Sequence, residues 1–152
     1  MKMIDRNPSQ PIKFCHISPT AYLHDYTVQN GAHLLLAHLV EQDQQYADYY
    51  ANLNDGKVKI MDNSAFEMFK QNRPMYDSSK LIEMGQRCGA DVIVMSDYPK
   101  ENWMKTVDAA SDMIPALKDA GFGTFFVPQS TLGDLNGVLK SFDWLLANRT
   151  LI

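Results

Sequence analysis

The chain has 152 residues, 45% hydrophobic and 21% charged, a balance typical of one globular domain of ordinary size. Its net charge of -4 argues against a dominant basic surface of the kind that nucleic-acid-binding domains carry, although a few local contacts would suffice to hold a nucleic acid. Cys15 and Cys88 form no paired motif, no run approaches the roughly 18 apolar residues of a membrane span, and no signal-peptide core opens the chain, so a reduced, cytoplasmic protein is expected.

Short apolar or β-branched segments bounded by turn residues predict five strands. They span residues 13–17, 34–40, 58–61, 92–96 and 124–127. His16 and His38 fall on the first two of these strands, where a histidine is more often packed and hydrogen-bonded than catalytic.

Helical patterns separate the predicted strands. One is expected around Tyr46 to Leu53, one from Ser78 or Ser79 to about Cys88, and one from Asn102 to near Gly121. A further helix over 134–147 is expected to face inward with Leu135, Val138, Leu139, Phe142, Leu145 and Leu146.

Alternating strands and helices predict parallel strands joined by right-handed crossovers, as in a TIM barrel or a doubly wound sheet. Five strands are fewer than the eight that close a barrel. The expected fold class is therefore α/β, an incomplete TIM-barrel-like fold. Residues 1–11 are expected to form an irregular arm, and residues 12–152 a single partial-barrel domain.

Two aspartates, Asp62 and Asp97, each follow the end of an apolar run. The carboxyl ends of neighbouring parallel strands meet at one rim, so both carboxylates are expected to face one ligand, such as the flat edge of a purine. Gln129 ends the fifth predicted strand at the same rim, where its amide could donate to a carbonyl oxygen. The alternatives are that the aspartates are helix caps and that Gln129 is a surface turn residue.

Other chemistry finds little support in the sequence. The four histidines show no metal-binding spacing, so no metal site is expected. No glycine-rich phosphate loop and no nucleophile elbow occurs.

Taken in order, these features resemble the tRNA-guanine transglycosylase superfamily, which includes queuine and archaeosine enzymes and viral relatives that modify DNA. That family's Asp-Ser-Gly-Gly-Phe/Tyr-Gln motif is similar to Asp-Asn-Ser-Ala-Phe-Glu at 62–67 here. Its second purine-binding aspartate is similar to Asp97, and its Val-Gln-Gly element is similar to Val-Pro-Gln at 127–129. Residues 31–38 resemble its second strand, so the parallel covers about residues 12–147.

The resemblance implies that Asp62 is the catalytic acid/base near a glycosidic bond, that Phe66 stacks on the base, and that Asp97 and Gln129 bind its edge. The implied reaction exchanges a guanine for a 7-deazaguanine in tRNA or DNA. The base is extruded, a carboxylate attacks the sugar's anomeric carbon as the guanine leaves, and the new base then displaces the carboxylate. The family's nucleophile and zinc site would fall beyond position 152, so no cofactor is expected here. Another copy, as in a homodimer, or a partner subunit would then complete the barrel.

Two other readings stay open. The chain is alternatively a non-catalytic partner subunit that pairs through exposed sheet edges, or an unrelated TIM-barrel-like enzyme, for instance a lyase or a sugar-phosphate enzyme. The sequence does not decide between tRNA and DNA, and it does not identify a nucleophile.

Overall fold

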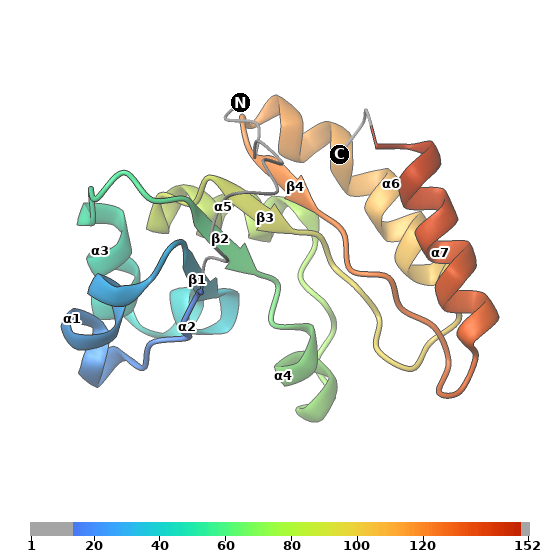
Figure 1. Ribbon diagram of the computed structural model, residues 1–152, viewed down its shortest axis with the longest axis horizontal. Coiled ribbons are helices and arrows are strands. Elements are labelled where there is room, and N and C mark those ends of the chain that lie inside the picture. Colours follow the sequence, from blue (N-terminus) through green and yellow to red (C-terminus); the bar gives the residue numbers. More distant parts are fainter. Residues whose placement is uncertain (1–13, 150–152) are drawn as a thin grey trace.

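A parallel β-sheet with helices between its strands forms the framework of the computed structural model, which describes residues 14–149 (Figure 1). Within these residues the sheet has four strands, and their spatial order is the order of the sequence. The strands are β1 (His33–Leu36), β2 (Lys59–Asp62), β3 (Val92–Val94) and β4 (Gly123–Phe125). The chain is thus a mixed α/β protein, as its sequence predicts.

Seven α-helices and two short 3-10 helices complete the described part of the chain. The α-helices are α1 (Leu23–Tyr26), α2 (Ala37–Gln42), α3 (Gln44–Asn52), α4 (Ala65–Lys70), α5 (Ser78–Cys88), α6 (Trp103–Asp119) and α7 (Leu135–Ala147). The 3-10 helices are η1 (Thr20–Tyr22) and η2 (Thr27–Gln29). No helix of residues 14–149 is long and apolar enough to cross a membrane.

The main helices pack on one face of the sheet, because right-handed crossovers between strands in sequential order all fall on the same side. Leu35, Met61 and Ile93 point to this side and are fully buried. Tyr46 of α3 is also fully buried, and its hydroxyl accepts the N-H of Leu36 at 3.1 Å. This layer between strands and helices is the core of the protein.

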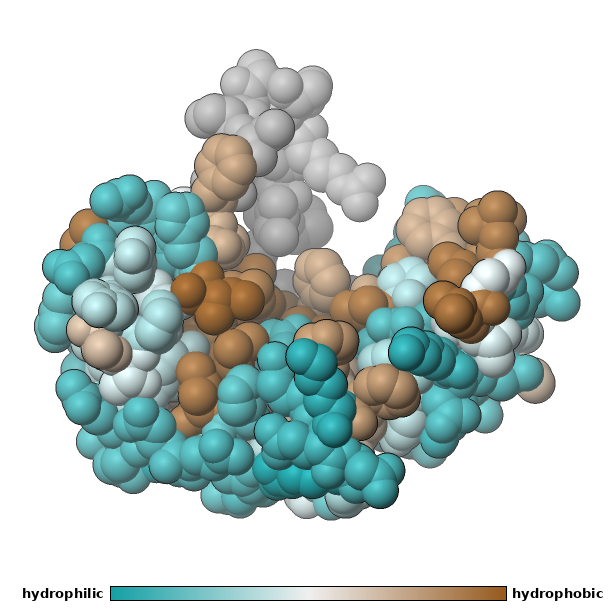
Figure 2. Space-filling model, turned by 90° about the horizontal axis from the view of Figure 1, so that it is seen from below, coloured by the Kyte–Doolittle hydropathy of each residue, from teal (hydrophilic) through white to brown (hydrophobic). Residues whose placement is uncertain are grey.

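The opposite face of the sheet carries the alternate side chains of each strand. Leu34 pairs with Ile60 and Leu36 with Asp62 in the β1–β2 register, and all four side chains are only partly buried. Phe125 of β4 is half exposed. Figure 2 shows a hollow between two lobes of the molecule, lined in part by hydrophobic residues.

Two predicted strands are wrong in part. Lys13 lies outside the described residues, and the rest of the segment 13–17 forms no strand: the His16 N-H donates to Asn30 Oδ1 rather than to a ladder. The segment 34–40 leaves the sheet after Leu36 and turns into α2, so His38 lies on a helix. A continuous apolar run has no period that separates a strand from a buried helix.

The predicted helices are present, and each begins at a side-chain cap. Asp43, Asp77, Asn102 and Asp134 accept backbone N-H groups at the starts of α3, α5, α6 and α7. The cap of α5 is therefore Asp77 rather than Ser78 or Ser79.

The predicted inward face of α7 is wrong for most of its residues. Leu135, Leu139, Phe142 and Leu146 are 45 to 70% exposed, while Gly137 and Ser141 are buried and Trp144 packs its ring on Phe126. This helix carries apolar residues on more than one side, and only the side that packs against α6 and the end of β4 is buried.

Candidate functional site at the carboxyl ends of the strands

Asp97 lies three residues after β3 and is buried, with 5% of its surface exposed. Its carboxylate accepts two side-chain amide hydrogen bonds, from Asn63 Nδ2 at 2.7 Å and from Gln129 Nε2 at 2.6 Å. It does not cap a helix, because Asn102 caps α6. Residues that follow β2, β3 and β4 therefore meet around one carboxylate.

Asn63 connects this carboxylate to the backbone of two strands. Besides Asp97, its side-chain amide donates to the carbonyl oxygen of Met95 at 2.5 Å, and its own Oδ1 accepts the N-H of Ala65 at 2.7 Å. Asn63 is 3% exposed, so all three contacts lie in the interior. Asn63 is not among the site residues predicted from the sequence, although it directly follows a strand-end aspartate.

Asp62 ends β2 and lies at the same rim. Its Oδ2 accepts the backbone N-H of Ser64 at 2.8 Å, a local turn of the kind that a capping aspartate makes. Its other oxygen, Oδ1, makes no hydrogen bond within residues 14–149. The local turn therefore uses only one of the two carboxylate oxygens of Asp62.

Ser64 and His38 form the next part of the site. Ser64 is fully buried and adopts a left-handed backbone conformation, with φ 58° and ψ 32°, at the start of α4. Its hydroxyl accepts the N-H of His38 at 3.1 Å and lies 2.9 Å from His38 Nδ1, to which it can donate its own proton. The turn after β2 therefore positions an imidazole from the start of α2.

Burial raises the pKa of both carboxyl groups above the ordinary aspartate value. For Asp62, the negative charges of Asp97 and Glu67 add to this effect, while the Ser64 N-H and His38 oppose it. For Asp97, burial prevails over the stabilising hydrogen bonds from Asn63 and Gln129. Two neighbouring carboxyl groups that hold protons to higher pH suit acid/base chemistry or hydrogen bonding to a flat heterocycle.

Replacing Asp62 with asparagine is expected to stabilise the protein at pH 7. The folded state binds the Asp62 proton more tightly than the unfolded chain does, so ionisation of this carboxyl costs stability above the folded pKa. An asparagine Oδ1 can still accept the Ser64 N-H. Thermal unfolding should show a melting temperature higher by a few degrees at pH 7, with the gain shrinking as the pH falls toward 3.8.

Asp108→Asn on the exposed side of α6 controls for the change in net charge. A lower melting temperature for Asp62→Asn at pH 7 would contradict the assignment of Asp62 as a partly buried carboxylate whose ionisation destabilises the fold.

The four predicted site residues do not all come together. Asp97 and Gln129 are in direct contact, and the charge of Asp97 acts on Asp62. Phe66 is on the first turn of α4, 58% exposed, with Lys70 Nζ 4.5 Å from the centre of its ring, and is not a member of this hydrogen-bonded group. The structure thus gives one polar cluster, made of Asp62, Asn63, Ser64, Asp97 and Gln129 with His38 beside it, which we call the strand-end cluster.

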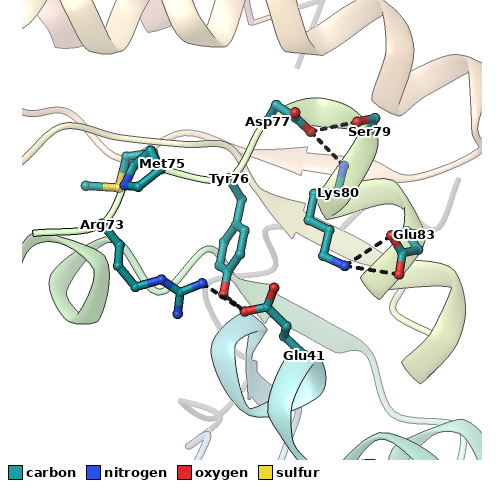
Figure 3. A pocket seen from close by; sticks show the side chains of 9 residues that line it. Glu41, Arg73, Met75, Tyr76, Asp77, Ser79, Lys80 and Glu83 are labelled. Carbon is teal, nitrogen blue, oxygen red and sulfur yellow. Dashed lines mark hydrogen bonds and ion pairs between the residues drawn. The ribbon is translucent and has the colours of Figure 1, made fainter. Parts of the chain in front are cut away.

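A separate hollow of about 480 Å³ lies between α2 and the start of α5. Figure 3 shows the Arg73 guanidinium and the Tyr76 hydroxyl meeting at the Glu41 carboxylate, at 3.1 Å and 2.6 Å. Burial and the nearby carboxylate raise the pKa of Tyr76 to about 12. These charges satisfy one another, so we assign the network a structural role that joins α2 to the segment before α5.

Within residues 14–149, no group of three or more His, Cys, Asp or Glu side chains is placed to hold a metal ion. In comparisons with known proteins, no family model, curated protein or solved structure matches this chain. What the fold and the site define is an α/β protein with a buried cluster of carboxyl and amide groups at the carboxyl ends of its parallel strands.

Proposed function

We propose that this chain recognises a guanine or 7-deazaguanine base at the strand-end cluster, in the manner of the tRNA-guanine transglycosylases, for base exchange in tRNA or DNA. The observation that carries the proposal is the convergence of the buried Asp97 and the partly buried Asp62 and Gln129, which follow or end three neighbouring strands, at one rim of the sheet. In it, Asp97 and Gln129 bind the edge of the base, Asp62 serves as acid/base, and Phe66 stacks on the base once the base is bound.

The strand order supports the barrel-like form of this proposal. A doubly wound sheet reverses its strand order at a switch point, whereas a barrel adds strands in sequence. The described strands run in sequence with the main helices on one face, as one part of a TIM-like barrel would. In such a barrel the hydrophobic face left open here faces the interior.

The backbone at Ser64 also supports the resemblance to this family. Ser64 stands where the family's motif has its first glycine, and it adopts the left-handed conformation that glycine reaches at little cost. The turn after β2 thus has the form that the family's glycine would allow, although the residue differs.

Isothermal titration calorimetry with guanine and with 7-deazaguanine tests the proposal. Asp97→Asn is expected to weaken binding about tenfold or more, because a buried charged hydrogen bond to the base becomes a neutral one. Asp108→Asn removes the same charge from the surface and should bind as the wild type does. Undiminished binding to Asp97→Asn would remove Asp97 from the site, and absence of binding to the wild-type protein would overturn the proposed function.

A second candidate is a partner subunit in a larger assembly, and the exposed stripe on α7 favours it. Leu135, Leu139, Phe142 and Leu146 recur at spacings of four, three and four, the pattern by which helices pair along one seam. Within residues 14–149, β1 and β4 each have one edge without a partner strand. A homodimer or a hetero-complex in solution without turnover would favour this candidate, and an active monomer would contradict it.

A further inference from the structure

Three lysines lie over three aromatic rings on α4, on the loop after β3 and at the start of α6. Lys70 Nζ is 4.5 Å from the centre of the Phe66 ring, Lys100 Nζ is 5.0 Å from that of Phe69, and Lys105 Nζ is 4.5 Å from that of Tyr98. We call these six residues the lysine–aromatic ledge. The Lys100–Phe69 contact joins α4 to the loop after β3, and Phe66 and Phe69 lie three residues apart on α4.

The ledge adjoins the strand-end cluster through the chain itself. α4 begins directly after Ser64, and the loop that carries Tyr98 and Lys100 begins directly after Asp97. In Figure 1 the segments that leave β2 and β3 run toward the same side of the molecule, where α4 projects. A strand held along the ledge would therefore pass beside the cluster.

Two rings and two ammonium groups of the ledge are open to a ligand. Phe66 is 58% exposed and Phe69 is 42% exposed. Lys105 pairs with Glu101 at 3.2 Å, but Lys70 and Lys100 form no ion pair with any carboxylate of residues 14–149. In a chain with a net charge of -4, two such lysines beside exposed rings make a local site for an anion with flat groups attached.

We propose that the lysine–aromatic ledge binds an unpaired stretch of nucleic acid that flanks the base held in the strand-end cluster. Bases stack on exposed rings without regard to sequence, and lysines neutralise the phosphates between them. A free base has no phosphate for the lysines, so the ledge would bind the polynucleotide and not the incoming base. This inference rests on the proposed function for the identity of the cluster's ligand.

Fluorescence anisotropy with labelled single-stranded 12-mers of DNA and of RNA tests the ledge. Lys70→Gln/Lys100→Gln is expected to weaken binding about tenfold or more and to reduce the steepness of the plot of log K against log salt by about 1.4, the value for two lost phosphate contacts on a single strand. Phe69→Leu should weaken binding about fivefold or more through lost stacking. Phe66 is left unchanged because the base-binding proposal uses it.

The matched control is Lys118→Gln/Lys140→Gln, which removes two charges from exposed positions on α6 and α7. It should change oligonucleotide binding less than twofold. Equal losses in the two double variants, or absence of oligonucleotide binding to the wild-type protein at low salt, would overturn the ledge. Circular dichroism of each variant checks that the fold is retained.

Calorimetry with free guanine separates this inference from the proposed function. The ledge variants should bind guanine as the wild type does. Suppose that the protein binds guanine, and that it binds the oligonucleotide equally well with and without Lys70 and Lys100. This result would contradict the role of the ledge but would be consistent with the proposed function. If the ledge variants lose oligonucleotide binding but the wild-type protein does not bind guanine, the role of the ledge is supported and the proposed function is contradicted.

Discussion

Asn63→Ala is expected to destabilise the protein by about 2–4 kcal/mol, the largest loss that a single polar side chain of the strand-end cluster should cause. The truncation removes the donor to Asp97 and to the Met95 carbonyl, and the acceptor for the Ala65 N-H, all in the interior. Buried polar groups that lose their partners cost their full desolvation. Urea denaturation at pH 7 measures the loss.

A double-mutant cycle with Asp97→Asn shows where this loss comes from. A neutral amide at position 97 needs the Asn63 donor less than a carboxylate does, so Asn63→Ala should cost about 1–2 kcal/mol less in the Asp97→Asn background. Additive losses would mean that Asn63 acts through the backbone of Met95 and Ala65 alone.

Gly85→Val is expected to destabilise the protein by about 2–3 kcal/mol through overpacking of the core. Gly85 is buried on α5, and a Cβ placed there would lie 2.8 Å from Ile93 Cδ1 and 3.0 Å from Phe122 Cζ. A valine must push α5 away from β3. The urea midpoint should fall accordingly.

Two comparisons sharpen the test at position 85. Gly85→Ala should change stability little, because the single methyl displaces only flexible side-chain ends and the helix gains about 1 kcal/mol in propensity. Gln86→Val puts the same side chain on the exposed side of α5 and should cost about 0.5 kcal/mol. A loss at Gly85→Val no larger than that at Gln86→Val would contradict close contact between α5 and β3.

The sequence predicted the ends of the middle strands well and the first strands poorly. β2 and β3 lie within about two residues of the predicted spans, because each is a short apolar run that ends at polar residues. The run that begins at Leu34 has no polar residue directly after Leu36 to mark where β1 stops. In the structure α2 begins at Ala37, where the N-H groups of Leu36 and His38 donate to the hydroxyls of Tyr46 and Ser64. α4 is six residues long and gave no periodic signal.

The site could be predicted only in part. The placement of Asp62, Asp97 and Gln129 at one rim followed from parallel strands ending in polar residues. The Asn63–Asp97 contact spans 34 positions and arises because β2 and β3 are neighbours, which no local pattern states. The exposure of the α7 stripe likewise depends on which side of the helix α6 covers.

The left-handed backbone conformation of Ser64 determines how the chain leaves β2 at the rim of the sheet. Its left-handed backbone turns the chain sharply after β2, so that α4 starts next to the carboxylates instead of continuing beyond the sheet. A glycine there would reach the same turn with less strain, but it would remove the serine hydroxyl that bonds both the N-H and the ring Nδ1 of His38. The strained residue at position 64 therefore has a second effect, which is to hold the imidazole of His38 near Asp62.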